Sequence, residues 1–575
     1  MITIWDWIIL LAFVGASLGI ALYASRQSGR SMGEFFLGGR QLPAWLAGLS
    51  IVATTFAADT PLLVTELVRT QGISGNWLWW NMLVGGMFTT FFFARLWHRA
   101  QITTDVELVS IRYSGPGARL LRPVKAIYFG LLLNAVIMAW VNLALVKIFQ
   151  GLFGIAADEA RLWTFGLLLL TAVYSLIGGL RGVVLTDAFQ FLLAMGGCIV
   201  LAFLVLGSSQ IGGISGLKAQ LVASGQSSVL WFFPQVGAQA SGLQVLSISL
   251  ASLLSFFGLQ WWAAWYPGNE PGGGGYVAQR LMATRGEAQA QQASLIFQIL
   301  HYCLRPWPWI LVALASLVLY PQLDDPGLGY VLAMRDFLPE GLRGLLLAAF
   351  LAAYMSTIST QLNWGASYLI HDAYAPARPG LSARQLVGAG RLATLGLALV
   401  GMFVTLFMDS LGQAFLFLIE ASAGLGGVLI ARWYWHRVNA WAELVAMATP
   451  IVLMILLRWL APELHAPYPF VLTALATTLC WVLAALLGPR TDPKVLAAFQ
   501  ARVRPMGSWP GGPGWLPTLR LAGRWLLSIV AAYSWLLAIG HLLLDLPHAY
   551  TLLALALLSS LLAALSLRSR SHPFA

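Results

Sequence analysis

Residues 49–61 read LSIVATTFAADTP and lie deep inside a long apolar segment. Asp59 stands near the middle of that segment, and Pro61 follows it. Proline has no amide hydrogen, and its ring crowds the carbonyl group four residues earlier, at Ala57. The neighbouring threonine and aspartate side chains also compete for backbone hydrogen bonds. We therefore predict a membrane-spanning helix that is unwound over residues 53–58.

The unwound segment has two interpretations. Carbonyl groups that are freed at membrane depth can hold a cation. Alternatively, the segment is a simple proline kink, and Asp59 is hydrogen-bonded to a neighbouring helix. An ionisable side chain inside a spanning segment is costly and marks a functional site by default. The sequence therefore favours the functional interpretation.

A second polar interruption, STISTQLN at residues 356–363, also falls inside an apolar stretch. Hydroxyl and amide side chains at that depth are costly unless they find partners. A single Ser or Thr is better explained by a hydrogen bond to the preceding turn or to a neighbouring helix. The cluster as a whole favours a site for a hard monovalent cation, which hydroxyl and carbonyl oxygens suit.

The composition is that of a polytopic membrane protein. The 575-residue chain is 59% hydrophobic and 10% charged, whereas a soluble globular chain carries about 25% charged residues. Apolar runs of about 20 residues, which can cross a bilayer, recur along nearly the whole chain. We predict an all-α protein with about 15 transmembrane helices, at residues 4–23, 42–68, 75–97, 124–150, 162–179, 185–207, 241–266, 290–319, 342–370, 386–408, 411–433, 440–461, 468–488, 522–545 and 549–567.

The distribution of Lys and Arg predicts the orientation. With the N-terminus outside, most of the 33 Lys and Arg residues fall in cytoplasmic segments, at 26–40, 95–125, 181, 280–285, 378–391, 432–437, 490–524 and 568–570. This asymmetry follows the positive-inside rule. We predict a multi-pass protein of the cytoplasmic (inner) membrane with a cytoplasmic C-terminus. The asymmetry also explains the net charge of +11 without a nucleic-acid partner.

The sequence offers little for enzymatic or metal chemistry. Its eight His residues are scattered. The three cysteines, Cys198, Cys303 and Cys480, fall inside apolar spans without metal-ligand spacing, so we expect inert thiols. The glycine run at 272–275 is not followed by Lys and Ser or Thr, as a phosphate-binding loop would be. We predict that the protein is not an enzyme.

A second interrupted span ends in GLQWWAAWY at residues 258–266, just before the Gly- and Pro-rich segment 267–275, which cannot be a regular helix. Two interrupted spans indicate a transporter whose binding site lies at the interface of two repeats. The aromatic residues have an alternative interpretation as an interfacial belt. We expect Thr60, Trp262 and Tyr266 to surround one solute cavity.

Arg305 lies near the centre of the span at 290–319 and is followed by two prolines. A guanidinium group at that depth must face a cavity or a carboxylate. Pairing with Asp59 or Glu420 is one explanation, and binding of a solute carboxylate or hydroxyl group is the other. We expect Asp59 and Arg305 to form polar walls of the solute cavity, which suits a zwitterion or a polyhydroxylated molecule.

Five motifs resemble the sodium/solute symporter family, which includes the proline, iodide, sialic acid and glucose symporters. They occur in the family's order within residues 5–435, and are Gly39–Pro43, Ala53–Asp59, Tyr174–Arg181 running on to Thr186–Gln190, Gln279–Arg280 and Met355–Thr357. The resemblance implies the leucine-transporter fold, with two inverted five-helix repeats preceded by one extra helix. It also implies coupling to sodium.

The resemblance further implies the sodium ligands. At the conserved family site, sodium would be held by carbonyl groups of Ala53, Phe56 and Ala353 and by the hydroxyl groups of Ser356 and Thr357. A possible second sodium site, found in some members, matches Asp187, Ser359 and Thr360. Asp187 also has a simpler interpretation as a carboxylate near a helix N-terminus. The insertion at residues 269–275 departs from the family pattern.

These features predict the organisation and the function of the chain. We expect an N-terminal extra helix and inner loop (1–40), a first repeat (41–207), an outer loop (208–240), a second repeat (241–437) and C-terminal helices (438–575), with a basic linker (489–521) that sets the last two helices apart. The predicted function is sodium-coupled symport of a small organic solute by alternating access across the lipid bilayer. The alternative is a transporter-like solute sensor that acts with a separate signalling partner.

Overall fold

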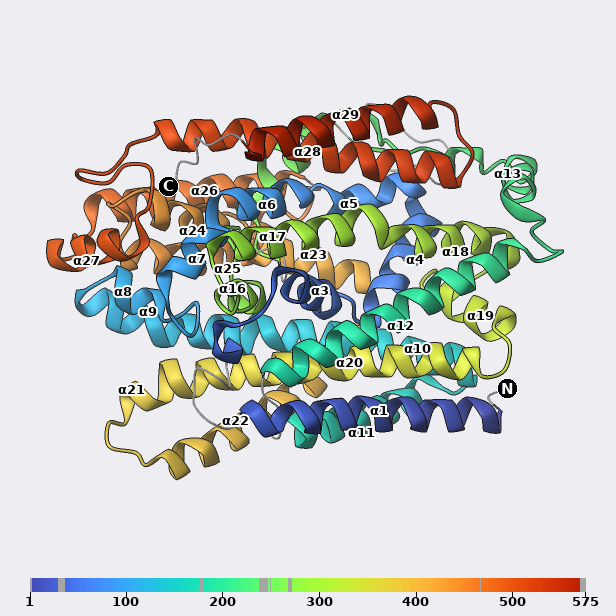
Figure 1. Ribbon diagram of the computed structural model, residues 1–575, viewed down its shortest axis with the longest axis horizontal. Helices are drawn as coiled ribbons and strands as arrows, with labels where there is room; N and C mark the ends of the chain where they lie inside the picture. Colours follow the sequence, from blue (N-terminus) through green and yellow to red (C-terminus); the bar gives the residue numbers. More distant parts are fainter. Residues whose placement is uncertain are drawn as a thin grey trace.

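The computed structural model describes residues 3–28, 37–175, 180–236, 247–248, 250–266, 271–465 and 467–568. Over these residues the protein is helical apart from two paired two-residue strands, β1 (Gln235–Val236) and β2 (Ser247–Ile248). The long helices run side by side along one axis (Figure 1). The predicted all-helical fold class is confirmed. Residues 176–179 of the third motif, and Asn269 and Glu270 of the insertion, lie outside the described part of the chain.

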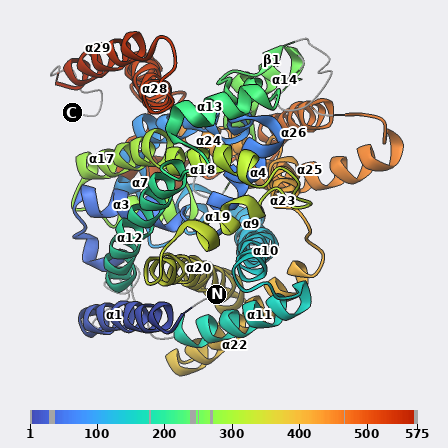
Figure 2. The same ribbon diagram turned by 90° about the vertical axis from the view of Figure 1, so that its right-hand side faces the viewer.

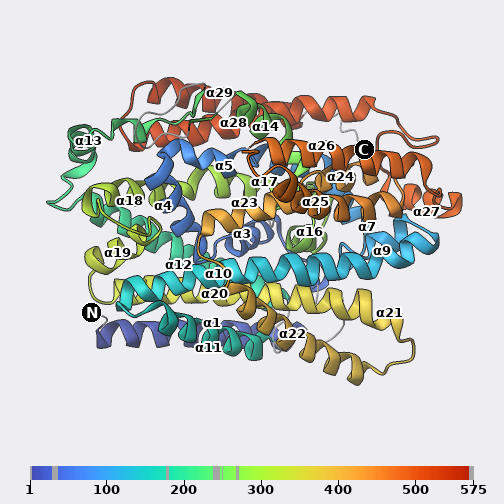
Figure 3. The ribbon, with the colours of Figure 1, turned by 180° about the vertical axis from the view of Figure 1, so that it is seen from behind.

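The extra helix and the predicted first repeat contain helices and, marked η, short 3-10 or π-helical turns. They are α1 (Ile4–Ser28), η1 (Gly38–Arg40), α3 (Ala44–Thr54), α4 (Asp59–Gln71), η2 (Ile73–Asn76), α5 (Trp77–Trp80), α6 (Leu83–Phe88), η3 (Thr89–Phe93), α7 (Ala94–Ala100), α8 (Leu108–Arg112), α9 (Gly115–Ile127), η4 (Tyr128–Leu133), α10 (Asn134–Phe153), α11 (Ala157–Ser175) and α12 (Leu180–Leu206). Seen from behind, α9 and α10 form one long rod (Figure 3).

The rest of the chain continues in the same way. Its elements are α13 (Gly213–Ala223), η5 (Ser227–Leu230), α14 (Leu250–Ser255), η6 (Phe256–Gln260), α15 (Trp261–Ala263), α16 (Gly275–Met282), α17 (Glu287–Gln298), η7 (Ile299–Leu304), α18 (Pro306–Leu319), α19 (Leu328–Phe337), α20 (Leu342–Ser367), η8 (Tyr368–Tyr374), α21 (Ala375–Ala377), α22 (Ala383–Thr405), α23 (Leu411–Ala421), α24 (Leu425–Tyr434), α25 (Ala440–Leu460), α26 (Tyr468–Leu487), α27 (Pro493–Val503), α28 (Leu516–Leu543) and α29 (Ala549–Arg568).

Many of these helices suit a bilayer. Among the described residues, nine helices are long and apolar enough to cross a membrane, and two bent pairs pass the same test together. The multi-pass architecture is confirmed, and the count of fifteen crossings stays a prediction. Viewed along the bundle, α1, α11 and α22 lie on one side and α28 and α29 on the opposite side (Figure 2).

The predicted break in the second span is confirmed. Helix α3 ends at Thr54, α4 begins at Asp59, and their axes differ by 61°. Within the break, the Phe56 amide donates to the Ala53 carbonyl (3.0 Å). The Thr55 hydroxyl donates to the Val52 carbonyl (2.8 Å). Local hydrogen bonds thus satisfy part of the backbone that the break frees.

A third break, which the sequence did not indicate, separates α23 from α24 by a 49° bend. It is hydrogen-bonded to the break that follows α15. The Trp265 amide donates to Ser422 Oγ (2.9 Å), which also lies 3.1 Å from the Trp265 carbonyl, and the Gly424 amide donates to the Ala263 carbonyl (3.0 Å). Since unpaired backbone groups are very costly in hydrocarbon, the two breaks stabilise each other.

The described part of the insertion packs against α7. The Trp97 indole donates to the Gly272 carbonyl (2.7 Å). Gly273 has a φ of 76°, and a Cβ there would lie 2.8 Å from Trp97 Nε1. The Gly275 amide donates to Asp105 Oδ2 (3.3 Å). Glycine is therefore required at position 273 both by the backbone conformation and by the close approach of Trp97.

Helix α1 is tied to α20 by a buried carboxylate. Asp6 Oδ1 accepts hydrogen bonds from the amides of Gly341 and Gly344 (2.8 Å each) at the N-terminus of α20. Four amides at any helix N-terminus lack intrahelical partners. The extra helix thus caps the helix that carries the hydroxyl cluster.

The basic linker and the helix that follows it contact the rest of the protein. It contains α27, and the Trp509 indole beyond that helix donates to the Trp433 carbonyl of α24 (2.9 Å). Helix α28 returns to the bundle, where the Tyr533 hydroxyl donates to the Trp80 carbonyl (2.9 Å). Aromatic donors that reach backbone carbonyls hold the C-terminal helices on the core.

Replacing Asp6 with alanine removes the acceptor for both α20 amides. We expect a loss of stability of about 1–2 kcal/mol, as for other capping residues, measured by thermal unfolding of the purified protein. The matched control is Asp158→Ala, since Asp158 is an exposed carboxylate in the first turn of α11 that pairs only locally, with Arg161. Equal melting temperatures for the two variants would contradict the capping role.

Candidate functional site

Asp187 of α12 is the centre of a buried polar cluster. The Ser356 hydroxyl of α20 donates to its Oδ1. The hydroxyl groups of Ser50 and Thr54, both on α3, donate to its Oδ2 (3.0 and 3.4 Å). Arg280 Nη2 of α16 lies 3.8 Å from the same oxygen. Four helices from both predicted repeats therefore meet at one carboxylate.

Arg280 is part of this cluster. Its side chain and that of Asp187 are each 1% exposed. Its guanidinium also donates to Ser50 Oγ and Thr54 Oγ1 (3.4 Å each). A buried ion pair is tolerated when further hydrogen bonds satisfy both groups. A cation that enters the cluster would compete with Arg280 for the same carboxylate oxygens.

The structure brings some of the predicted sodium ligands together and keeps others apart. Ser356, expected at the conserved site, and Asp187, expected at the second site, are hydrogen-bonded to each other. The Ser359 hydroxyl instead donates to the Ser356 carbonyl (3.0 Å). No hydrogen bond joins Ser359 or Thr360 to Asp187 within the described residues. Thr357 Oγ1 is buried and has no hydrogen-bond partner there.

Ala53, Phe56 and Ala353 are all buried, at 8%, 1% and 5% exposed. Ala53 and Phe56 lie at the end of α3 and in the break, and Ala353 lies one turn before Thr357 on α20, which contacts α3. The five residues expected to hold sodium therefore come from α20 and from the end of α3 with the break that follows it.

Sequence reasoning did not assign Ser50, Thr54 and Arg280 to this cluster. One signal was available for the first two: they lie four residues apart, so they share a face of α3 just before the break. Arg280 belongs to a quoted motif, but nothing in its local sequence points to Asp187. The helix-cap interpretation of Asp187 loses support, because α12 runs from Leu180 and dipole effects fade beyond the first turn.

A cavity lies beside the cluster. It has a volume of about 60 Å³ and is lined by Thr54, Thr55, Ala57, Asp59, Thr60, Leu63, Val64, Trp79, Met82, Ile137, Trp140, Val141, Tyr266, Tyr276, His301, Tyr302, Arg305, Thr357 and Gln361. Four predicted solute-binding residues, Asp59, Thr60, Tyr266 and Arg305, belong to this lining. Apolar and aromatic walls with a few convergent polar groups are typical of small-molecule sites.

Trp262 lies outside this lining. Its indole donates to the Gly258 carbonyl (2.7 Å), and its ring packs against Gly427 of α24. In a continuous helix it would share a face with Tyr266, four residues later. The chain leaves the helix at Ala264, where ψ is 151°, so this periodicity does not apply.

Arg305 contacts the unwound segment rather than a carboxylate. Its Nη1 donates to the Val52 carbonyl (3.2 Å) and to Thr55 Oγ1 (3.0 Å), and its guanidinium carbon lies 5.2 Å from the centre of the Trp309 ring. No ion pair joins it to Asp59 or Glu420 within the described residues. Its Nε is buried without a partner there. Arg305 can therefore donate to a solute.

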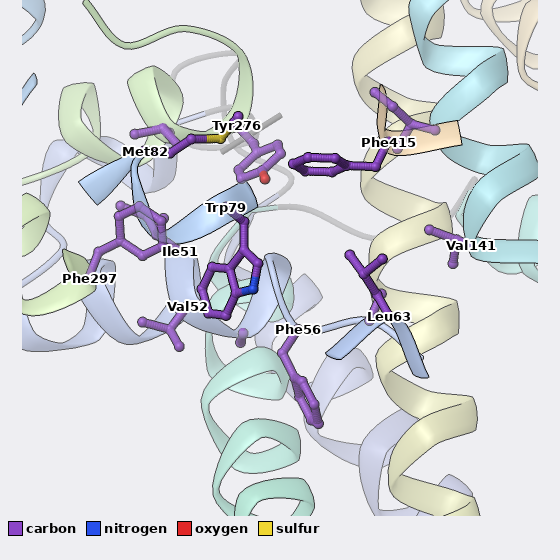
Figure 4. Packing of buried hydrophobic residues seen from close by; sticks show 14 of the residues in the cluster. Ile51, Val52, Phe56, Leu63, Trp79, Met82, Val141, Tyr276, Phe297 and Phe415 are labelled. Carbon is purple, nitrogen blue, oxygen red and sulfur yellow. The ribbon is translucent and has the colours of Figure 1, made fainter. Parts of the chain in front are cut away.

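Several lining residues carried no clear signal in the sequence. They include Trp79, Trp140 and His301. Figure 4 shows Trp79 between Leu63 and Met82. His301 lies one helical turn before Arg305, and its Nδ1 is 3.2 Å from Thr55 Oγ1. These side chains converge only through the packing of separate helices.

Thr54 connects the cavity with the polar cluster, and Thr357 lines the same cavity beside it. Both line the cavity. Thr54 also donates to Asp187, and Thr357 lies next to Ser356 on α20. A solute in the cavity and a cation among these hydroxyl groups would contact the same two side chains.

Residues 35–449 match the sodium:solute symporter family. The chain belongs to this family. Curated relatives of the symporter include the sodium/glucose cotransporter of Vibrio parahaemolyticus, 24% identical over 491 residues that cover 79% of this chain and 85% of the relative. The sodium/mannose cotransporter of Bos taurus is 24% identical and covers 76% of each chain. The sodium/myo-inositol cotransporter 2 of Rattus norvegicus is 25% identical, covering 76% of this chain and 67% of the relative.

Among solved structures, a Na+-coupled sialic acid symporter in a substrate-bound outward-open state superposes on the symporter with a TM-score of 0.67. It is 19% identical, and the match covers 85% of this chain and 99% of that chain. The expected leucine-transporter fold is confirmed. The protein is a sodium-coupled symporter and not an enzyme, and none of these comparisons favours the sensor.

Ser356→Ala combined with Thr357→Ala removes two hydroxyl groups from the expected sodium site. We expect the sodium concentration for half-maximal uptake to rise at least about tenfold, which corresponds to roughly 1.4 kcal/mol. Uptake into proteoliposomes at a series of sodium concentrations measures this. The control is Thr394→Ala, since the hydroxyl of Thr394 on α22 only donates to the preceding turn (3.0 Å). Unchanged sodium dependence in well-folded protein would refute the assignment.

Asp187→Asn keeps the size of the side chain but removes its charge. We expect weaker sodium binding, because Asn offers one acceptor oxygen and no charge to the four groups that surround position 187. Isothermal titration with sodium measures the change, and sodium-driven uptake measures its effect on transport. Wild-type values in both experiments would mean that the carboxylate has only a structural role.

Proposed function

We propose that the symporter imports a polyhydroxylated solute, a sugar or a cyclic polyol, together with sodium. The observation that carries the proposal is Thr54, which lines the cavity and donates to Asp187, while Thr357, an expected sodium ligand, lines the same cavity. The names of the curated relatives, which concern glucose, mannose and myo-inositol, support this class of solute.

The chemistry of the cavity supports the same class. Hydroxyl groups both donate and accept hydrogen bonds, so they can meet the carboxylate of Asp59, the guanidinium of Arg305 and the amide of Gln361. The rings of Trp79 and Trp140 offer flat apolar faces to the carbon skeleton. A fixed anion and a fixed cation at one cavity leave no net charge for the solute to neutralise.

We propose that sodium binds between the break of the second span and α20. Its ligands are the carbonyl groups of Ala53, Phe56 and Ala353 and the hydroxyl groups of Ser356 and Thr357. Asp187 lies beside this site and receives sodium on its way to the cytoplasm, where it exchanges the cation for Arg280. We also propose that the N-terminus lies outside the cell and that the symporter resides in the inner membrane.

Coupling follows from the shared threonines. Sodium draws the unwound segment towards α20, which positions Thr54 and Thr357 at the cavity wall. The solute then meets a wall that is already ordered, and it stabilises the same arrangement in return. Coupling between two binding equilibria is reciprocal. Sodium therefore raises the affinity for the solute by the same factor by which the solute raises the affinity for sodium.

Paired titrations test this function. We expect saturating glucose, mannose or myo-inositol to tighten sodium binding by the same factor by which sodium tightens binding of that solute. Isothermal titration of each ligand, with and without the other, measures both factors. Equal sodium affinity with and without all three solutes would refute the proposed solute class.

Arg305→Gln provides the matched variant. We expect it to weaken solute binding at least about tenfold, or roughly 1.4 kcal/mol. The control is Arg458→Gln, because Arg458 lies 3.5 Å from Glu420 and does not line the cavity. Equal solute affinities of these two variants would exclude Arg305 from the site.

A further inference from the structure

Another cavity lies between α23, α25 and α26, away from the solute cavity. Its volume is about 310 Å³, and small-molecule sites typically measure about 300–1,000 Å³. The three helices are neighbours at the edge of the bundle (Figure 2). Within the described residues, its lining and that of the solute cavity have no member in common. We call it the edge cavity.

The edge cavity lies on a surface that faces lipid. Only 33% of the most apolar stretch of α25, and 33% of that of α26, is buried inside the protein. Trp459 at the end of α25 and Tyr468 at the start of α26 are 79% and 51% exposed. Exposed Trp and Tyr at the ends of spanning helices are typical of the boundary between hydrocarbon and lipid headgroups. The lining includes Arg458 and Pro469, next to these two residues, so the cavity lies near headgroup level.

Two opposite charges line the edge cavity. In the described part of the chain, Glu420 of α23 and Arg458 of α25 are its charged lining residues. Arg458 Nη2 lies 3.5 Å from Glu420 Oε2, and the two side chains are 64% and 32% exposed. An N–H···O hydrogen bond usually spans about 2.7–3.2 Å, and exposed ion pairs contribute little to stability. A ligand can therefore insert between the two groups at low cost.

These charged groups have no other polar partner. Neither side chain makes a hydrogen bond to any of the described residues. The hydroxyl of Thr473, a buried residue of the same lining, makes none there either. A guanidinium offers five N–H donors and a carboxylate offers two acceptor oxygens. Since polar groups beside hydrocarbon are costly without partners, the cavity favours an occupant that carries both an anion and a cation.

The other walls of the edge cavity are mostly apolar. They include Met454, Leu457 and Phe470. Ile455 and Leu472, on the same two helices, are 60% and 47% exposed, and they extend the apolar surface along the bundle. An occupant with long hydrocarbon chains would bury these chains against this surface. The charges, the depth and the apolar surface together fit a membrane lipid.

We infer that the edge cavity binds the headgroup of a phospholipid that carries both a phosphate and a primary ammonium group. Arg458 binds the phosphate, because a planar guanidinium matches the geometry of phosphate oxygens. Glu420 accepts from the ammonium, whose N–H groups are donors. A trimethylammonium group has no N–H, so a choline headgroup cannot form this bond. In the predicted orientation the bound lipid belongs to the outer leaflet.

The identity of the transported solute does not affect this site, because none of its residues lines the solute cavity. Native mass spectrometry of the delipidated, full-length protein measures lipid binding. One dioleoyl lipid is added at a time, namely phosphatidylethanolamine, phosphatidylcholine or phosphatidylglycerol. We expect phosphatidylethanolamine to bind at least about tenfold more tightly than either of the others, because each of them lacks a charge-assisted hydrogen bond to Glu420.

Two variants separate the two contacts. We expect Glu420→Gln to lose the preference for phosphatidylethanolamine over phosphatidylcholine. We expect Arg458→Gln to weaken both of these lipids at least about tenfold, since both carry the phosphate. The matched control is Glu463→Gln, because Glu463 is exposed in the connection between α25 and α26 and does not line the cavity. We expect this control to keep the preference of the wild type.

A third variant guards against misfolding of the charge variants. Leu464 lines the cavity from the same connection and is half-buried, so Leu464→Trp fills the cavity without changing a charge. We expect it to weaken phosphatidylethanolamine at least about tenfold, with an unchanged melting temperature.

Several outcomes would overturn the lipid site. Equal binding of phosphatidylethanolamine and phosphatidylcholine by the wild type does so, as does tighter binding of phosphatidylglycerol, which would indicate a site for anionic lipids. A preference for phosphatidylethanolamine that persists in both Glu420→Gln and Leu464→Trp places the lipid elsewhere on the protein. Failure of the wild type to bind any of the three lipids also overturns the site.

Discussion

The requirement that every backbone polar group find a partner inside an apolar medium governs this structure. Helices meet it automatically, but a helix that is broken to create a binding site does not. The protein meets the requirement locally at the first break, where Thr55 and Ala53 supply partners. At the other two breaks it does so mutually, through Ser422, Trp265 and Gly424. The position of the cavity follows, because it lies where freed backbone and polar side chains meet.

The buried charged side chains also have hydrogen-bond partners within the protein. The buried carboxylate of Asp187 accepts from three hydroxyl groups and faces one guanidinium. Arg305 is likewise held by a carbonyl that belongs to the end of α3. Each of these buried charged groups is therefore bonded to a different helix, and movement of that helix would change the bonds. Transport by alternating access requires such attachments, because sites with two discrete arrangements convert binding into movement.

Local rules in the sequence predicted some features and not others. The break at residues 55–58 was predictable because Pro61 and Asp59 act within one helical turn. The multi-pass architecture was predictable from the long apolar runs, and the hydroxyl cluster from the polar residues that interrupt one of these runs. The partners of Asp187 were not, since Ser50 and Arg280 are far from it in sequence and meet it only after the repeats pack. Trp262 was expected in the cavity because its aromatic segment adjoins an interrupted span, but its ring packs against Gly427 of α24 instead. The break at Ser422 gave no signal because a Ser-Ala-Gly run is common in membrane helices.

The hydrogen bonds between Ser422 and Trp265 have a mechanical consequence. They fasten the end of α15 to the end of α23, so neither can rotate alone. Helix α16, which follows α15 across the insertion, carries Arg280, whereas α23 carries Phe415, whose ring packs against Tyr266. The two breaks thus join the element that holds Arg280 to the element that holds Phe415. A tilt that withdraws Arg280 from Asp187 must therefore move Phe415 as well, so that these two contacts cannot change independently.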